Sequence, residues 1–363
     1  MFLEKNTKNV RSLFTVFALA LTVILSGASI GDAQTTPTTT VRLDDFVGDN
    51  RTDWTTLQNV FSPAGSPIRW KVLQNPAPTA PNAAFRRDFN YGLNNTDTIT
   101  VGDYVGDSKS EPTVWRESTQ GVFYVGNFPL STGGITLNRA VSWGNGATDV
   151  PGAQGDYDGD GKTDYTVVRV TGGNVVWYIL GSVSNTTRAV TFGTVTGVTG
   201  PAVFPGADFN GDGRDELVYL TRNVSGTMVN YFIGDAVTGA GVITRSFGNF
   251  NTDFNVAPDD YTGDGRADFV AVRETQGPNA IWYIGNSQNT TVTATAFGIA
   301  DPTFADLDLP VRGDFDGDGR HDICVWRESN QTFYFLSTAF PGQIGGQKHG
   351  DVGDFPLGSF GLY

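Results

Sequence analysis

The residues best suited to chemistry in this chain are the aspartates of an acidic loop that occurs six times. The two fullest copies read Asp156-Tyr-Asp-Gly-Asp-Gly-Lys-Thr-Asp164 and Asp314-Phe-Asp-Gly-Asp-Gly-Arg-His-Asp322. In chain order, loops 1 to 6 begin at Asp45, Asp103, Asp156, Asp208, Asp260 and Asp314. Carboxylate oxygens at this density, with glycines between them, suit a hard divalent cation, above all Ca²⁺. The sequence therefore predicts a set of calcium sites.

Each loop is numbered here from its first aspartate. The fullest copies carry carboxylates at positions 1, 3, 5 and 9, and the main-chain carbonyl at position 7 is a further ligand. Glycines at positions 4 and 6 permit positive φ, so a short loop can wrap its oxygens around one point. The ligands expected in the four stronger loops are Asp156, Asp158, Asp160, Lys162 and Asp164; Asp208, Asn210, Asp212, Arg214 and Glu216; Asp260, Thr262, Asp264, Arg266 and Asp268; and Asp314, Asp316, Asp318, Arg320 and Asp322.

Loops 1 and 2 are expected to bind more weakly. They place Val47 and Val105 at position 3, and Asn50 and Ser108 replace the glycine at position 6. A metal-free turn held by the first aspartate is an open alternative for these two loops. Their candidate ligands are Asp45, Asp49 and Asp53 in loop 1, and Asp103, Asp107 and Glu111 in loop 2.

An EF-hand is excluded for the two fullest loops. That motif places a glutamate at position 12 and flanks the loop with helices. Position 12 is Val167 in loop 3 and Val325 in loop 6. The metal-binding loops must therefore belong to another architecture.

The loop starts lie 58, 53, 52, 52 and 54 residues apart, and a near-constant period of this kind indicates a solenoid or a propeller. Each unit divides into four short segments: an extended stretch before the loop, an apolar run after it, a segment with paired aromatics such as Trp177 and Tyr178, and a segment ending in an aromatic residue or His before Gly. Runs that are apolar on both faces suit strands covered on both sides.

Four strands per unit predict an all-β fold, a six-bladed β-propeller of four-stranded blades. Six complete units are expected from about Val41 to Gly350, and the tail at 354–360 repeats the first-strand pattern. We expect this tail to close the ring on the first blade. Seven blades are the alternative, and a solenoid is disfavoured because no polar caps are evident.

The pattern Asp-Phe/Tyr-x-Gly-Asp-Gly-x-x-Asp, with the aromatic-Gly pairs and the Trp/Val-Arg pairs, resembles FG-GAP/VCBS repeats. Such repeats build the propeller of integrin α subunits and occur in bacterial secreted proteins. The resemblance covers roughly residues 41–363 and implies Ca²⁺ between the first two strands of each blade. It does not imply integrin function, because propellers host many unrelated activities.

The first 33 residues are expected to be a signal peptide. Three basic residues precede an apolar run at 13–25, which is too short to span a bilayer as a helix, and Gly31 and Ala33 suit signal peptidase. Residues 34–40 would then be a polar leader, and residues 41–363 a single propeller domain. We expect a secreted or surface-exposed protein without a membrane span.

The formal net charge of −14 disfavours a nucleic-acid partner. The single cysteine, Cys324, excludes an intrachain disulfide, and its apolar neighbours indicate a small buried side chain. Stability must therefore come from the core and from metal.

No catalytic constellation is found in the sequence. The two histidines are His321, expected to be solvated within loop 6, and His349, expected to pack in the place of an aromatic residue. An arginine recurs at the end of the second strand, which indicates a structural ion pair or a cap to the gap between blades rather than a set of ligand-reading groups. These arginines are Arg116, Arg169, Arg273 and Arg327.

The expected function is a non-catalytic binding or adhesion module, monomeric, for a protein or glycan ligand. A carbohydrate-active enzyme or a lectin on the same ring is the alternative. Unsymmetrical acid pairs in the central funnel would favour the enzyme, and similar pockets between blades would favour the lectin. Because all acidic loops share one rim, we expect the ligand on the opposite rim, with the turns at 117–120, 274–279 and 328–331.

Overall fold

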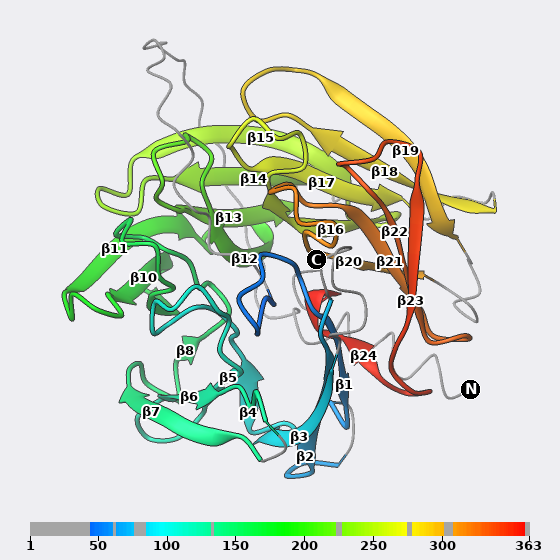
Figure 1. Ribbon diagram of the computed structural model, residues 1–363. Helices are drawn as coiled ribbons and strands as arrows, with labels where there is room; N and C mark the ends of the chain where they lie inside the picture. Colours follow the sequence, from blue (N-terminus) through cyan, green and yellow to red (C-terminus); the bar gives the residue numbers. More distant parts are fainter. Residues whose placement is uncertain are drawn as a thin grey trace.

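The computed structural model describes residues 44–60, 63–75, 85–131, 134–222, 227–273, 278–300 and 308–359. These residues form six four-stranded sheets arranged around a common centre (Figure 1). The prediction of an all-β, six-bladed propeller is confirmed. The expected signal peptide and polar leader lie outside the described residues. Within those residues, no helix is long and apolar enough to cross a membrane.

Each blade is numbered by its acidic loop, and its strands are given from the inner to the outer edge. Blade 1 contains β24 (Phe355–Pro356), β1 (Trp54–Gln58), β2 (Pro67–Leu73) and β3 (Arg86–Leu93). Blade 2 contains β4 (Asp97–Ile99), β5 (Thr113–Arg116), β6 (Val122–Asn127) and β7 (Thr136–Ser142). Blade 3 contains β8 (Asp149–Val150), β9 (Tyr165–Thr171), β10 (Asn174–Leu180) and β11 (Thr187–Thr194).

The remaining three blades follow the same order. Blade 4 contains β12 (Thr199–Ala207), β13 (Glu216–Arg222), β14 (Met228–Gly234) and β15 (Gly241–Asn249). Blade 5 contains β16 (Asp253–Asp259), β17 (Asp268–Arg273), β18 (Asn279–Gly285) and β19 (Val292–Ile299). Blade 6 contains β20 (Asp308–Val311), β21 (Ile323–Arg327), β22 (Thr332–Leu336) and β23 (Ile344–Lys348), and a 3-10 helix, η2 (Leu357–Ser359), follows β24.

The C-terminal tail closes the ring, as expected. Strand β24 pairs antiparallel with β1, placing Phe355 opposite Leu57. The expectation of six complete units from Val41 is wrong in one respect: blade 1 takes its inner strand from the tail, because β24 occupies the inner edge of β1. The Nζ of Lys71 lies 2.8 Å from Oδ1 of Asp354, and both side chains are almost fully buried. This ion pair ties the tail to β2.

The hydrophobic core lies between neighbouring blades, because the inner strands of each sheet are apolar on both faces. Trp177 of β10 is fully buried and packs in one cluster with Leu217 and Tyr219 of the next blade. Burying a large apolar side chain stabilises a fold by about 1.5–3 kcal/mol. Cys324 is fully buried in such a layer, as expected. The core therefore holds the blades in a fixed array and presents the loops between strands at two rims.

The recurring arginines form structural ion pairs, which was one of the two structural roles expected from their repeated position. Nε of Arg169 lies 2.5 Å from Oδ1 of Asp149 at the start of the inner strand, and the Asp149 side chain is fully buried. The same carboxylate accepts a hydrogen bond from the main-chain N–H of Asn145, in the connection from blade 2. Equivalent pairs are Arg116–Asp97, Arg273–Asp253 and Arg327–Asp308. Each pair therefore fixes the passage from one blade to the next.

Candidate metal centre

In blades 2 to 6 the acidic loop connects the first to the second strand, and in blade 1 it leads directly into β1. The first aspartate builds each loop around its own carboxylate. In loop 3, Oδ1 of Asp156 accepts a hydrogen bond from the N–H of Gly159 at 2.8 Å, and Oδ2 accepts one from Gly161 at 2.7 Å. Both glycines have positive φ, 77° and 82°, which glycine adopts without steric cost. The loop geometry is therefore set locally, by the alternation of Asp and Gly.

All six loops share this backbone, including the two that lack the second glycine. In loops 1 and 2, Asn50 and Ser108 take the left-handed conformation, with φ of 64° and 62°. Their N–H groups still donate to the first aspartates, Asp45 and Asp103. A left-handed non-glycine residue costs roughly 1–2 kcal/mol, so the surrounding structure imposes the loop on these two sequences.

The carboxylate at position 9 ties the loop to a second segment. Asp164 is fully buried; its Oδ2 accepts a hydrogen bond from the N–H of Tyr157, and its Oδ1 accepts one from Ser182 at 3.0 Å. Ser182 lies in the turn between β10 and β11. Asp322 of loop 6 receives the equivalent hydrogen bonds from Phe315 and Thr338. The turn between the third and fourth strands therefore forms one wall of the site.

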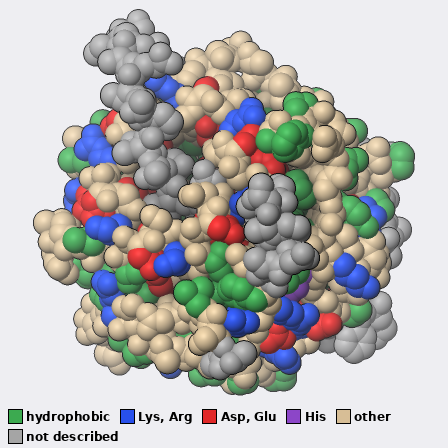
Figure 2. Space-filling model, in the orientation of Figure 1, with side chains coloured by type: hydrophobic (Ala, Val, Ile, Leu, Met, Phe, Trp, Pro, Cys, Tyr) green, Lys and Arg blue, Asp and Glu red, His purple; other side chains and the backbone are tan. Residues whose placement is uncertain are grey.

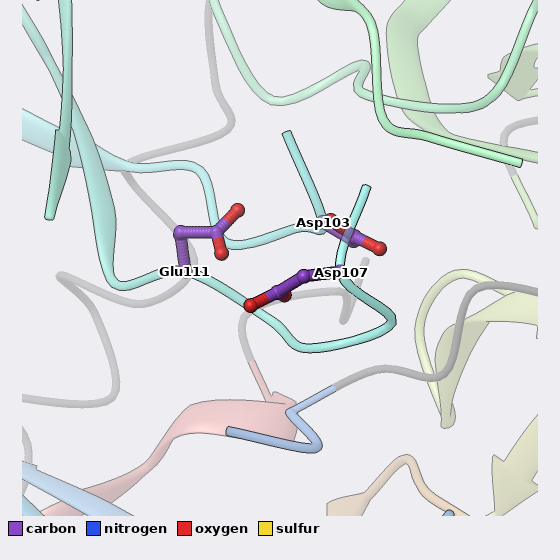
Figure 3. A group of neighbouring side chains, drawn as sticks. All are labelled: Asp103, Asp107 and Glu111. Atoms are coloured by element: carbon purple, nitrogen blue, oxygen red, sulfur yellow. The ribbon is translucent and has the colours of Figure 1, made fainter. Parts of the chain in front are cut away.

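Three loops bring three acidic side chains together, with ligand oxygens within 4.8 Å of one another. Figure 3 shows the carboxylates of loop 2 gathered beside the chain that carries them. In loop 2 the position-5 carboxylate takes part, whereas in loops 3 and 6 the position-3 carboxylate does. The three groups are Asp156, Asp158 and Asp164; Asp314, Asp316 and Asp322; and Asp103, Asp107 and Glu111.

The position-5 aspartates of loops 3 and 6 are not in these groups, although the sequence made them candidate ligands. Oδ2 of Asp160 lies 3.7 Å from Nζ of Lys162, and Oδ2 of Asp318 lies 2.6 Å from Nη2 of Arg320. The basic residue at position 7, whose carbonyl was the expected ligand, thus holds the position-5 carboxylate by its side chain. Arg214 and Asp212 of loop 4 pair in the same way.

The candidate ligands of loops 1, 4 and 5 make individual contacts. In loop 1, Asp53 accepts a hydrogen bond from the N–H of Phe46, and in loop 5, Asp268 accepts one from Thr262. Other side-chain contacts of candidate ligands in these loops include Gln74 to Asp49, Asn210 to Glu216, Asn286 to Asp264, and Arg266 to Gln288. The first carboxylates, Asp208 and Asp260, accept main-chain hydrogen bonds as in loop 3.

Three candidate ligands carry a buried carboxylate oxygen that has no hydrogen-bond partner among the described residues. These oxygens are Oδ1 of Asp49, Oδ1 of Asp158 and Oδ1 of Asp268. An unsatisfied buried acceptor costs about 1–3 kcal/mol, more for a charged group. A divalent cation in the loop would satisfy it. The residues present in loops 1, 3 and 5 therefore fit a metal ion.

Burial raises the pKa values of the gathered carboxylates. It raises the pKa of Asp164 to about 7, with a further contribution from the charge of Asp158, and that of Asp322 to about 7, with a contribution from Asp316. Burial raises the pKa of Glu111 to about 8, with Asp103 and Asp107 adding to the effect. Close carboxylates in a desolvated loop thus compete for protons, which a bound cation would displace.

The turns between the third and fourth strands carry contact residues that the sequence analysis missed. The Oγ of Ser184 donates to Oδ2 of Asp158 at 3.0 Å, and the Oγ of Ser337 donates to Oδ2 of Asp316 at 2.5 Å. Asn286 has the same role toward loop 5. A small polar residue shortly after the third strand of these repeats was the available signal.

The expectation that His321 is solvated is wrong. His321 is only 8% exposed. Its Nε2 lies 3.3 Å from Oδ2 of Asp259, and its ring meets the ring of Tyr261 edge-on. Position 8 of each loop faces the preceding blade, which explains the burial. His349 packs as expected: it is 4% exposed, and its carbonyl accepts a hydrogen bond from Trp326.

Residues 156–219, 208–271 and 260–325 match the family model of the FG-GAP-like repeat. This chain is an FG-GAP repeat propeller protein. The three matched segments begin at the first aspartates of loops 3, 4 and 5, so the family repeat runs from one acidic loop into the next.

Solved structures similar to this FG-GAP repeat protein include TolB from Acinetobacter baumannii, at 16% identity and a TM-score of 0.43, covering 88% of this chain and 66% of TolB. A rhamnogalacturonan lyase from Bacillus licheniformis is 13% identical with a TM-score of 0.31, covering 82% of this chain and 68% of the lyase. The chain thus spans about two thirds of each. At this level of similarity neither bears on its activity. No curated protein sequence matches the chain.

Proposed function

We propose that this FG-GAP repeat propeller is a secreted or surface-exposed calcium-binding module that binds a protein or glycan ligand without catalysis. The observation that carries the metal part is the convergence of three carboxylates in each of three loops, together with the unpartnered buried oxygen of Asp158. All candidate side-chain ligands are oxygen donors, which favours a hard cation over zinc or copper.

Calcium fits these loops better than magnesium. Calcium accepts six to eight oxygens in flexible geometry, whereas magnesium demands a near-ideal octahedron and keeps several waters. In loops 3 and 6 the chain offers carboxylates at positions 1, 3 and 9 and a carbonyl at position 7. The carboxylate at position 9 can also bind through both oxygens.

We place ligand binding on the rim opposite the acidic loops. A groove of about 420 Å³ lies between blades 1 and 2, and its lining includes Asn90, Tyr91, Arg116, Tyr124 and Leu137. A second groove of about 400 Å³ lies between blades 2 and 3, where the turn after β5 meets the connection from β7 to β8. Both grooves contain residues at those strand ends that lie farthest from the acidic loops. Their position supports this rim as the ligand-binding side.

A glycan-binding function is the second candidate, because the first groove combines two tyrosine rings with amide and guanidinium groups. An aromatic ring with a polar tip can contact both the apolar face and the hydroxyls of a sugar. The enzyme reading receives less support. Asp259, which precedes loop 5 as Asp44 precedes loop 1, lies 3.4 Å from Arg312, which compensates its charge, and 3.3 Å from His321.

The face drawn in Figure 2 carries acidic and basic side chains side by side rather than in one patch of a single sign. Attraction of a highly charged polymer is therefore not the principle of recognition on that face. Shape and local contacts in the grooves fit a glycan or a folded protein better.

The experiment is a glycan array and a cross-linking screen on the purified full chain, with and without calcium. We expect Asn90→Arg, at an exposed residue of the first groove, to abolish ligand capture. Val242→Arg, on the outer strand of blade 4 and 43% exposed, is the matched control and should bind normally. Cross-links confined to the acidic-loop rim would contradict the proposed binding side.

A further inference from the structure

The six acidic loops form a closed ring of main-chain hydrogen bonds. In each case the N–H at position 8 of one loop donates to the carbonyl at position 1 of the preceding loop, at 2.7–2.8 Å. The sixth bond returns from loop 1 to loop 6, so the ring has no free end. The six bonds are Ser110 to Asp45, Thr163 to Asp103, Asp215 to Asp156, Ala267 to Asp208, His321 to Asp260, and Thr52 to Asp314.

Each of these bonds joins a candidate ligand of one loop to the residue that precedes a candidate ligand of the next loop. Asp156 supplies the first carboxylate of loop 3, and its carbonyl holds the N–H of Asp215. The next residue, Glu216, supplies the last carboxylate of loop 4. The first ligand residue of one loop and the last of the next are thus separated by one hydrogen-bonded peptide group.

Side chains make a second connection at the same places. The basic residue at position 7 lies against the position-4 glycine of the preceding loop, and a Cβ on Gly159 would come within 2.5 Å of Cγ of Arg214. At the ring closure, Arg51 of loop 1 donates from Nη1 to the carbonyl of Phe315 at 2.8 Å and from Nη2 to that of Asp316. The other contacts are Gly48 with Lys109, Gly106 with Lys162, Gly211 with Arg266, and Gly263 with Arg320.

We propose that the six loops take up divalent cations cooperatively, so that occupation of one loop favours occupation of both neighbours. This inference rests on the proposed calcium binding and concerns its regulation. A cation fixes the residues at positions 1 and 9 of its own loop. Position 1 is hydrogen-bonded to position 8 of the next loop, and position 9 adjoins the residue that is hydrogen-bonded to position 1 of the previous loop. Both neighbouring loops are therefore partly ordered before they bind a cation.

The order of the loops around the ring gives this coupling a direction. Loops 1 and 2, which lack a side-chain oxygen at position 3, are neighbours, and the two fullest loops, 3 and 6, flank them. Loop 2 is bonded to loop 3 through Thr163, and loop 1 to loop 6 through Thr52. Loops 1 and 2 therefore fill after loops 3 and 6, and depend on them.

The test is a calcium titration of the full chain followed by hydrogen–deuterium exchange at peptide resolution. In Asp158→Ala, which damages loop 3, the calcium concentration for half-protection should rise about fivefold or more in loops 2 and 4, the lower range for allosteric coupling, and stay unchanged in loop 6. Asp88→Ala, at an acid of β3 outside the loops and outside both grooves, is the control. Unchanged titration of loops 2 and 4 would overturn the proposal.

A second variant avoids the ligands altogether. Arg51→Ala removes the side-chain contact from loop 1 to the main chain of loop 6 and leaves every candidate ligand in place. We expect weaker calcium protection of loop 6. Titration of loop 6 as in the wild type would count against the coupling. If the wild-type chain showed no calcium-dependent protection in any loop, the proposed calcium binding itself would fail.

Discussion

In loop 3 the carboxylates at positions 1, 3 and 9 converge, whereas in loop 2 Val105 occupies position 3 and those at positions 1, 5 and 9 converge. The two loops nevertheless share one backbone. Gly159 and Gly106 have φ of 77° and 79°, and Gly161 and Ser108 have φ of 82° and 62°. The pair shows that the ring and the first aspartate set the backbone, while side chains decide which oxygens meet.

A consequence is that the ligand set can vary without loss of the fold. The hydrogen bond from Thr163 to the carbonyl of Asp103 and that from Asp215 to Asp156 do not depend on side chains at position 3 or 5. Glu111, one methylene longer than Asp164, reaches the same kind of main-chain partner, the N–H of Tyr104. Metal affinity and folding are therefore separable to a degree, which mutations can measure.

The largest effect should follow chelation of the loaded protein. A cation that binds the folded chain alone adds about 2.7 kcal/mol per site at a hundredfold excess over Kd. With several sites and no intrachain disulfide, we expect the melting temperature to fall by more than about 10 °C. Calorimetry with and without chelator measures this. An unchanged melting temperature, in protein shown beforehand to contain metal, would contradict the account.

Exchange of the position-3 residues tests the comparison directly. Asp158→Ala converts loop 3 to the ligand set of loop 2 and should weaken its calcium binding about tenfold, equivalent to 1.4 kcal/mol. Val105→Asp supplies the missing carboxylate and should strengthen loop 2. Isothermal titration calorimetry of both variants and the wild type gives the comparison. Opposite signs are expected, and an unchanged calcium affinity in both variants would show that position 3 is not a ligand.

The pH dependence should differ between metal-free and loaded protein. Folding raises the pKa of Asp164 and Asp322 from 3.8 to about 7, so the folded state holds protons that the unfolded state releases. These two groups contribute stability below pH 4 that is lost as the pH rises to about 7. Chemical denaturation of chelated protein between pH 4 and 7 should show this decline.

In loaded protein the trend should reverse, because protons compete with the cation. Calcium affinity should increase with pH, and loop 2 should need a higher pH than loop 3, since the pKa of Glu111 is about 8 and that of Asp164 about 7. Peptide-resolved exchange at pH 6 and pH 8 separates the two loops. An identical pH response in both loops would show that these two carboxylates do not govern binding.

The smallest effect concerns the backbone at position 6. Ser108→Gly removes the left-handed strain in loop 2 and should stabilise the fold by about 1 kcal/mol. Gly161→Ser in loop 3, where the φ of 82° is equally left-handed, is the matched reverse change and should cost a similar amount. Thermal melts of both chelated variants measure these differences. A destabilised Ser108→Gly would mean that the hydroxyl group makes a contribution of its own.

The repeat period and the alternation of Asp and Gly predicted the blades, the loops and their shared rim, because these depend on local backbone preferences. The tail at 355–356 was also recognisable, since it repeats the first-strand pattern. Its replacement of the inner strand of blade 1 was not predicted, because the segment before loop 1 was expected to supply that strand. The partners of Asp160 and Asp318 were missed although they are local: a basic side chain two residues away competes for each carboxylate.

The burial of His321 shows the limit of reading a loop alone. Position 8 is polar or small in several loops, such as Thr163 and Ser110, and its contact lies in the preceding blade. The ring of hydrogen bonds between loops likewise involves only main-chain atoms, which every sequence possesses. It becomes visible only when six blades are placed around one axis.

The most direct test of the central claim, that these loops are calcium sites, is native mass spectrometry of the full chain after equilibration with calcium. The account predicts at least three bound calcium ions, one for each converging group of carboxylates, and loss of one or more in Asp158→Ala. A wild-type chain that stays folded and binds no calcium at millimolar concentration would contradict it.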